Sequence, residues 1–494
     1  MAQNDAHVKR TVITSLMWRY GERMGAQVVG FVVSIILARL LEPEHYGVIG
    51  MLNIFIAVSN AIIISGLSSA LIQKKNADNL DFSTVFYFNA GFSLLLYAII
   101  FAVAPTISAF YEMPELCSTL RVLALSILVG AVNTVQHAYA ARKMQFKRFF
   151  FSTIFGTIAS GVVGIVMAYG GCGVWALVGQ NLTSITISTI VLWFTVKWHP
   201  QRAFSWERLR TLYSFGWKVL VTKLLQTLYI NVYALVIGKV YTTSDLGYYN
   251  RGKQWPLLIL DEITNSIDSV LFTTLSKYQD EKQRVKAMVR RSIKTCTFLV
   301  MPMMAGLAAV ARPLTILVLT EKWLPSVPFL QFCCFTYAFS PIETANIQAI
   351  KALGRSDILL KLEIISKTVG ISMLLLTVRH GLMAMMVGRC FATVICSVVR
   401  IYPNSKLLGY SFFEQWRDFG PSFLLSLAMF AVVYTMEFLP LGQILVLFLQ
   451  IIAGVLFYAF GAKLFKFESF DYLWNTAVAE IKKRKKPQAG TKEA

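Results

Sequence analysis

Basic and amide side chains recur along two apolar segments at a spacing that places them on one face of a helix. Arg19, Arg23 and Gln27 follow one another at intervals of four residues, and Lys218 and Gln226 lie eight residues apart in a later segment. An ionised side chain in the middle of a bilayer costs about 3 kcal/mol, so such residues tend to face a wet cavity. We therefore predict a basic cavity that binds an anionic group. The residues predicted to line it are Arg19, Arg23, Gln27, Lys218, Gln226, Arg251 and Arg389.

The basic residues of these stripes have a second interpretation. Arg19, Arg23 and Lys218 lie near the ends of their apolar segments, from which a long side chain can reach the lipid headgroups. Each stripe continues inward as an amide, Gln27 or Gln226, and a residue that only anchors a helix end does not require this. The continuation favours the cavity.

Carboxylates in two further segments are candidates for ion coupling or for pairing with the cavity. Asp261, Asn265 and Asp268 share one helix face, and Glu343 follows Pro341, whose missing N–H loosens the helix there. These carboxylates either pair with basic residues or hold a coupling cation, and exchange of protons at Asp261 or Glu343 is the corresponding hypothesis for H⁺ coupling. The full set of candidates is Glu22, Asp261, Asn265, Asp268 and Glu343.

The sequence contains no recognisable motif for nucleotide hydrolysis, metal binding or hydrolase catalysis. There is no Walker A loop, HExxH pair or GxSxG motif, and the seven cysteines include no CxxC pair. We expect no enzymatic activity, no metal site and no cofactor apart from coupling to H⁺ or Na⁺.

The elements that position these residues are transmembrane helices. The chain has 494 residues, of which 56% are hydrophobic and only 15% are charged, whereas soluble proteins carry about 25% charged residues. Since a span needs about 20 mostly apolar residues, we predict an all-α membrane protein of about fourteen helices. The predicted spans are 12–39, 47–72, 82–110, 117–140, 149–169, 173–196, 212–238, 247–275, 289–311, 325–350, 358–378, 382–401, 414–437 and 441–463.

The distribution of basic residues predicts the orientation of these spans. Loops after even-numbered spans are rich in lysine and arginine, as in 142–148 and 277–291, whereas most loops after odd-numbered spans, such as 111–114 and 170–173, hold few or none. By the positive-inside rule, we expect both termini in the cytoplasm. The net charge of +21 is therefore explained by loops that face anionic lipid, and we expect no nucleic-acid partner.

An internal repeat with an offset of about 200 residues relates the two halves. Trp18-Arg19 corresponds to Trp217-Lys218, and Arg39, eight residues before Gly47, corresponds to Lys239, eight residues before Gly247. Six spans in each copy give a parallel repeat of two lobes. We predict lobes at 1–200 and 201–405, an extra helix pair at 406–465, and an interfacial segment with a basic cytoplasmic tail at 466–494.

Four stretches of the sequence have the character of family motifs: 36–47 (ILARLLEPEHYG), 66–74 (GLSSALIQK), 140–147 (AARKMQFK) and 173–178 (GVWALV). They resemble polysaccharide-unit flippases, which belong to the superfamily that also contains multidrug extruders and the lipid II flippase. Within this superfamily, the sequence resembles the branch of O-antigen, colanic-acid and teichuronic-acid exporters.

The resemblance implies a substrate and a set of partners. It implies an oligosaccharide on a polyprenyl diphosphate, turned across the bacterial inner membrane by alternating access, with membrane lipids and a polysaccharide polymerase or export machinery as partners. A basic passage suits the anionic headgroup, and the extra helix pair offers the lipid tail a groove. Two alternatives stay open: a cation-coupled multidrug extruder, which favours an acidic cavity, and a membrane polymerase or glycosyltransferase.

Overall fold

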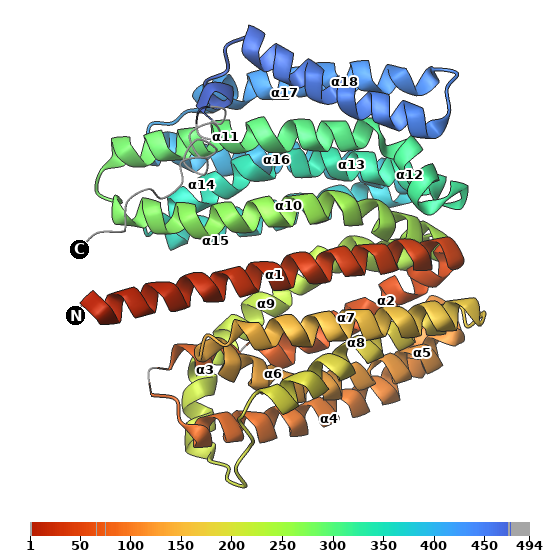
Figure 1. Ribbon diagram of the computed structural model, residues 1–494, viewed down its shortest axis with the longest axis vertical. Helices are drawn as coiled ribbons and strands as arrows, with labels where there is room; N and C mark the ends of the chain where they lie inside the picture. The colour runs from red at the N-terminus through yellow and green to blue at the C-terminus, as the bar shows by residue number, and fades with distance from the viewer. Residues whose placement is uncertain (1, 66, 75, 473–474, 476–494) are drawn as a thin grey trace, which may run out of the picture. The chain divides into compact units, whose positions relative to one another are not determined.

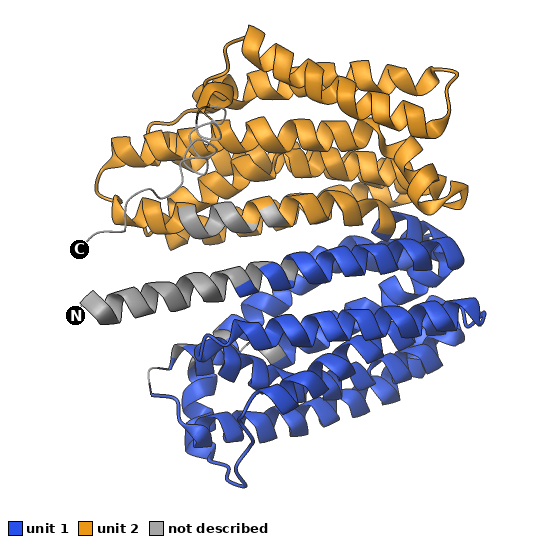
Figure 2. Ribbon diagram, viewed as in Figure 1, with its two compact units in different colours: residues 1–250 blue, residues 251–494 orange. Residues whose placement is uncertain are grey.

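The computed structural model describes the backbone of the chain except at residues 1, 66, 75, 473–474 and 476–494. Within helices, it describes no side chain at residues 2–17, 19–20, 23, 64–65, 69, 73, 215, 218, 262 and 265–270. The described chain forms two compact units, residues 1–250 and 251–494, coloured separately in Figure 2. The predicted boundaries at 200/201, 405/406 and 465/466 stay a prediction.

The N-terminal unit is built from nine helices and the first part of a tenth, in the part of the chain that the structure describes (Figure 1). They are α1 (Ala2–Leu40), α2 (Pro43–Ser65), α3 (Leu67–Gln73), α4 (Asn79–Tyr111), α5 (Glu115–Leu123), α6 (Leu125–Arg142), α7 (Phe146–Tyr169), α8 (Val174–Thr195), α9 (Trp206–Val240) and residues 243–250 of α10 (Thr243–Lys277). In this unit α7 packs against α1 and α8, and α9 packs against α2 and α3.

The C-terminal unit continues with the rest of α10. Its further elements are α11 (Lys282–Ala309), α12 (Ala311–Leu319), η1 (Glu321–Ser326), α13 (Val327–Ala338), α14 (Ser340–Ala352), α15 (Ser356–Thr377), η2 (Val378–His380), α16 (Leu382–Leu407), α17 (Phe412–Thr435), η3 (Met436–Phe438) and α18 (Gln443–Leu464). The last two long helices, α17 and α18, lie side by side and α17 packs against α11 (Figure 1).

The all-helical membrane class is confirmed. The described elements are all helical, and ten of the described helices are long and apolar enough to cross a membrane. Large apolar side chains such as Phe448 and Val455 of α18 are 62% and 64% exposed, which suits a surface covered by lipid. Each of the fourteen predicted ranges is mostly helical, although several, such as 117–140 and 325–350, are divided between two helices. The crossing of a membrane by all fourteen stays a prediction.

The predicted repeat partners Gly47 and Gly247 meet inside the N-terminal unit. A Cβ on Gly47 would lie 1.8 Å from the carbonyl oxygen of Thr243, and a Cβ on Gly247 would lie 2.1 Å from that of Pro43. The first turns of α2 and α10 thus approach each other closely and reciprocally. Only glycine leaves room for this contact.

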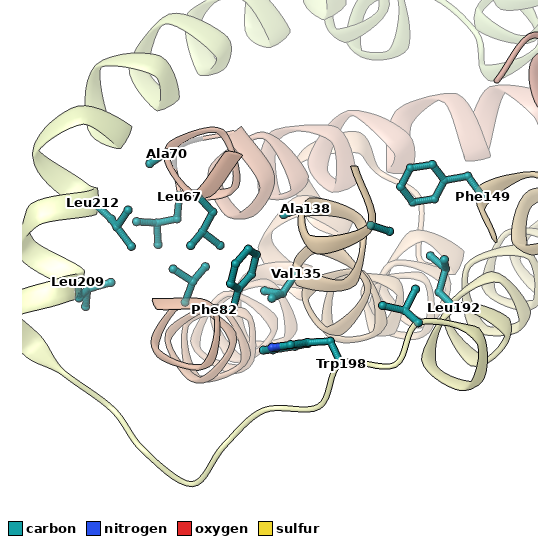
Figure 3. Packing of buried hydrophobic residues seen from close by; sticks show 14 residues of the cluster. Leu67, Ala70, Phe82, Val135, Ala138, Phe149, Leu192, Trp198, Leu209 and Leu212 are labelled. Atoms are coloured by element: carbon teal, nitrogen blue, oxygen red, sulfur yellow. The ribbon is translucent and has the colours of Figure 1, made fainter. Parts of the chain in front are cut away.

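The core of the N-terminal unit at one end of the bundle joins α3, α4, α6, α8 and α9 (Figure 3). Phe82, Val135 and Trp198 are nearly or fully buried there, and the rings of Phe82 and Trp198 lie 5.9 Å apart. The amide of Gln136 donates to the carbonyl oxygen of Trp198 over 3.0 Å and fixes the chain after α8. This core holds the start of α9 against α3 and α4.

A buried carboxylate joins three segments beside this core. Asp81, which is fully buried, binds Lys74 at 2.7 Å and Arg208 at 3.2 Å. Asp78 caps α4 by accepting from the Asp81 amide at 2.9 Å, and that hydrogen bond, together with the nearby Arg208, lowers the pKa of Asp78. The charges therefore tie the start of α9 to the α3–α4 turn.

The stretches that carry the family resemblance contact one another. Arg142 of 140–147 donates to the carbonyl oxygen of Leu71, in 66–74, over 2.9 Å. Gly173 has a φ of +53°, and a Cβ there would lie 2.9 Å from the Nε2 atom of His45, in 36–47. These motifs therefore build joints between helices of the N-terminal unit.

Candidate functional site

A polar pocket of about 630 Å³ lies inside the N-terminal unit. Its lining comes from α2, α3, α6, α7, α8 and α9 and consists of Asn60, Ser68, Ile72, Gly130, Asn133, Thr134, His137, Ala138, Ala141, Phe149, Ile185, Val219 and Lys223. This described lining holds one lysine and one histidine and contains no carboxylate. The pocket therefore suits a polar or anionic ligand better than a cation.

Packing fixes the polar groups of this pocket. The ring of His137 stacks on Phe149 with centroids 4.6 Å apart. No described residue forms a hydrogen bond with the Oδ1 atom of Asn133 or the Oγ atom of Ser68, although both atoms are buried. Since a buried polar atom without a partner is costly, these two atoms are ready to bind a hydroxyl-rich ligand.

The side chains of several residues predicted for the cavity or for ion coupling lie outside the described residues. They are Arg19, Arg23, Lys218, Asn265 and Asp268. Among the described candidates, Gln27 is half-buried, Gln226 is exposed and Glu22 accepts a hydrogen bond from Thr153 at 2.9 Å. The joint cavity of these residues stays a prediction.

Arg251 and Arg389 lie in different surroundings within the C-terminal unit. Arg251 is only 4% exposed, donates to Gln254 over 2.8 Å and lies over the fully buried ring of Trp323. Arg389 is half-buried, with its guanidinium 6.0 Å from the ring of Tyr337. Burial of Arg251 against Trp323 gives it a packing role in this structure, whereas Arg389 retains partial access to solvent.

Lys253 was outside the predicted site and joins it in the structure. It interacts electrostatically with Arg389 and Asp261, two of the predicted residues. The side chain of Asp261 is exposed. Lys253 therefore lies within electrostatic range of both Arg389 and Asp261.

Glu343 forms a polar network between α14 and α16. It pairs with Arg400 and accepts a hydrogen bond from Ser397 at 3.0 Å, and Glu343 and Arg400 are each 18% exposed. One turn further along both helices, Asn404 donates to the Oδ1 atom of Asn346 over 2.6 Å. The two rungs hold α14 and α16 in register.

An apolar groove of about 600 Å³ lies on α11, α17 and α18. Its wall includes Phe298, Pro302, Gly306, Met429, Val433, Leu447, Gly454, Val455, Tyr458 and Phe470. The ring of Phe470, in the predicted interfacial segment 466–494, lies 6.4 Å from the ring of Phe298. The basic tail at 482–486 lies outside the described residues.

The Tyr458 hydroxyl replaces a hydrogen bond that is missing from the backbone of α11 beside this groove. Pro302 has no N–H, so the carbonyl oxygen of Phe298 loses its partner within the helix. The Tyr458 hydroxyl donates to that oxygen over 3.0 Å from α18. The proline and the tyrosine together attach the extra helix pair to α11.

Replacement of Tyr458 by phenylalanine is expected to leave the Phe298 carbonyl oxygen unsatisfied and to cost about 1–2 kcal/mol of stability. Thermal unfolding of the purified protein measures the effect. Tyr434→Phe is the matched control, because Tyr434 makes ring contacts with Phe430 and Phe438 that phenylalanine retains. Equal loss in both variants would contradict the proposed role of the Tyr458 hydroxyl.

Sequence reasoning missed Asn60, Asn133 and Lys223 as residues of one pocket. Lys223 lies off the Lys218–Gln226 stripe of α9, so its helix position gives no reason to place it with the others. Asn60 and Asn133 are amides inside apolar segments, which is the one signal that marks them. Their meeting depends on tertiary packing of α2, α6 and α9.

Relatives of the chain include proteins named for surface polysaccharides. The chain is 24% identical to the "Uncharacterized membrane protein in cps region" of Klebsiella pneumoniae, with 82% of each chain covered. It is 23% identical to the succinoglycan biosynthesis transport protein ExoT of Rhizobium meliloti, with 71% of each covered. It is 21% identical to the lipopolysaccharide biosynthesis protein WzxC of Escherichia coli, over 84% of this chain and 85% of that protein.

Solved structures with the same fold are membrane transporters. The lipid II flippase MurJ in an inward closed conformation superposes with a TM-score of 0.73 at 16% identity, covering 91% of this chain and 98% of that one. An inward-facing multidrug MATE transporter gives 0.59 at 14% identity, covering 78% and 96%. The model of the family described as polysaccharide biosynthesis protein matches residues 36–328. The chain therefore belongs to this polysaccharide biosynthesis protein family, and it has the fold of MurJ and MATE transporters.

Proposed function

We propose that the protein flips oligosaccharides linked to a polyprenyl diphosphate across the bacterial inner membrane, for synthesis of a surface polysaccharide. The observation that carries the proposal is the polar pocket of the N-terminal unit, in a chain of the polysaccharide biosynthesis protein family. Lys223 supplies a cation for an anionic headgroup, and Asn60, Asn133 and His137 supply hydrogen-bonding groups for sugar hydroxyls. Names of relatives such as ExoT and WzxC support the same class of substrate.

The lipid tail of this substrate has a candidate path on the other unit. The groove of α11, α17 and α18 is lined almost wholly by apolar side chains, among them Phe298, Met429 and Val455. A polyprenyl chain in such a groove keeps hydrocarbon in contact with hydrocarbon during transport. We propose that the extra helix pair serves the tail while polar pockets serve the headgroup.

The topology of the chain and its partners follow from the same reasoning. We propose fourteen spans, both termini in the cytoplasm, and alternating access of two lobes, because the predicted ranges are all mostly helical and the loop charges alternate. A polysaccharide polymerase or export machinery would then receive the product. Catalysis is not part of this proposal.

Coupling to H⁺ or Na⁺ completes the proposed cycle. Protonation of Glu343 would remove its charge from Arg400 and loosen the contact of α14 with α16, which is a way to link an ion to a movement. Transport assays under collapsed proton and sodium gradients test this step. Unchanged transport without either gradient contradicts it.

Substitution of Lys223 tests the headgroup pocket. In a host deleted for its own copy of the gene, Lys223→Ala is expected to lower surface polysaccharide by about tenfold and Lys223→Glu to abolish it, because a carboxylate repels the diphosphate. Lys223→Arg retains the charge and should retain most export. Polysaccharide staining with immunoblots of membrane protein measures both quantities.

Arg210→Glu is the matched control for charge reversal, since Arg210 is an exposed residue of the same helix outside the pocket. Full export by Lys223→Glu at normal protein level would remove Lys223 from the substrate path.

The cation-coupled multidrug extruder remains the second candidate, because MATE transporters share the fold. It is disfavoured by the described lining of the polar pocket, which offers a lysine and a histidine but no carboxylate to a cationic drug. Drug-resistance assays in a pump-deleted host discriminate between the two.

A further inference from the structure

A second pocket, of about 420 Å³, lies in the C-terminal unit between the first half of α11 and the short segment 468–472. Its lining consists of Ala287, Arg290, Arg291, Lys294, Thr295, Glu468, Ser469 and Tyr472. Three of these side chains are cations, Arg290 and Arg291 on one turn of α11 and Lys294 on the next. The pocket is therefore basic and carries two hydroxyl-bearing side chains, Thr295 and Ser469, besides the phenol of Tyr472.

The buried carboxylate of Asp418 holds two of these cations, Arg290 and Lys294, in place. Asp418 of α17 has a side chain only 1% exposed, and it binds Arg290 at 2.7 Å and Lys294 at 3.4 Å. The hydroxyl of Tyr410 donates to the same carboxylate over 2.7 Å. Because Asp418 is fixed by these partners, the two cations are positioned at the pocket rather than free to extend into solvent.

The remaining contacts of the pocket are exchangeable. Glu468 binds Lys294 at 2.7 Å, but its side chain is 81% exposed and can return to water. The hydrogen bond from Lys294 lowers the pKa of Glu468, so this carboxylate stays ionised and occupies the place of an anion. Arg291 lies 4.1 Å from the ring centroid of Tyr472, which leaves its N–H groups at the edge of the pocket.

The basic pocket continues into the apolar groove along α11. The pocket uses residues 287, 290, 291, 294 and 295, and the groove continues the same face as Phe298, Leu299, Pro302, Met303 and Gly306. On the facing segment, Ser469 lines the pocket and the next residue, Phe470, lines the groove. One helix face thus offers charge at one end and hydrocarbon at the other.

We propose that this continuous face binds a lipid-borne phosphate monoester, with the phosphate in the basic pocket and the chain in the groove. When Glu468 is displaced, three cations face the single buried carboxylate of Asp418 and leave two positive charges. A phosphate monoester carries a charge of about −1.5 to −2 and three acceptor oxygens, which balances this excess better than the single charge of a phosphodiester. The site is additional to the headgroup pocket of the N-terminal unit, and it shares with the proposed function only the groove.

Binding to the purified full-length protein tests the site without transport, so that it can fail separately from the proposed function. The probe is a polyprenyl phosphate, and the comparison ligands are the parent polyprenol, phosphatidylglycerol and inorganic phosphate. Arg291→Gln is expected to weaken binding of polyprenyl phosphate about tenfold, because it removes a charge-assisted contact while leaving Asp418 and its partners in place. Glu468→Gln is expected to tighten binding a few-fold, because it removes the competing anion.

Arg284→Gln is the matched control, since Arg284 lies on the same helix, pairs with the exposed Glu281 and contributes nothing to the pocket. The proposal is overturned if Arg284→Gln weakens binding as much as Arg291→Gln, or if Glu468→Gln weakens it. Equal binding of polyprenol or phosphatidylglycerol overturns the assignment to a phosphate monoester, and equal binding of inorganic phosphate overturns the role of the groove.

Discussion

Alanine in place of Gly47 is expected to destabilise the protein by about 3 kcal/mol or more, the largest effect we predict for a single methyl group. The new Cβ would lie 1.8 Å from the carbonyl oxygen of Thr243, and a backbone atom cannot rotate away as a side chain can. Gly247→Ala should behave in the same way, because its Cβ would lie 2.1 Å from the carbonyl oxygen of Pro43. Thermal unfolding in detergent and the amount of protein in membranes measure the loss.

Gly91→Ala is the control for this pair. Gly91 is also helical, in α4, but no atom lies within 4 Å of the position of an added Cβ. Alanine is the better helix former, so this variant should be unchanged or slightly more stable. A Gly47→Ala protein as stable as Gly91→Ala would show that α2 and α10 do not approach as closely as the structure has them.

Loss of Arg400 is expected to have the second largest effect. Arg400→Ala leaves the Glu343 carboxylate between α14 and α16 without its cation, and an uncompensated charge in such a place costs about 3 kcal/mol. We expect a lower melting temperature and loss of export. Surface polysaccharide is measured on the cells, and the melting temperature is measured on the protein from the same cells.

A double variant and a surface pair give the controls for Arg400. Glu343→Gln combined with Arg400→Gln removes both charges and is expected to recover much of the stability lost in either single variant. Arg355 pairs with Asp357 at 2.8 Å on the surface, and Arg355→Ala should leave the melting temperature unchanged because both side chains remain in water. A double variant whose loss of stability equals or exceeds the sum of the two single losses would contradict a charge-pair role.

The helices of this protein could be predicted from the sequence more completely than their joints. Apolar runs and loop charges predict each helical range, because every span must be apolar over the thickness of the bilayer. The range 117–140 is nevertheless divided at Ala124 into α5 and α6, and 325–350 is divided at Phe339 into α13 and α14. Such breaks leave the hydropathy of a segment unchanged, so hydropathy cannot reveal them.

The partners of the polar residues could not be predicted from the sequence either, because they depend on tertiary contacts. Glu343 could be chosen from the sequence as a charge deep in an apolar segment, but its partner Arg400 lies 57 residues further on and needed the packing of α14 against α16. The local sequence gives no reason to group Asn60, Asn133 and Lys223. They share a pocket only because α2, α6 and α9 pack together. The repeat marks Gly47 and Gly247 as equivalent positions, but their contact appears only in the structure.

Rescue of flippase-deleted strains tests whether the protein flips lipid-linked oligosaccharides. The chain is expressed in a set of strains that each lack their own flippase and make different, known surface glycans, with the Lys223→Glu variant as the inactive control. We expect the wild-type chain to restore surface polysaccharide in at least one strain, and Lys223→Glu to restore none at equal membrane level. Failure in every strain, together with raised resistance to cationic drugs in a pump-deleted host, would contradict a flippase function.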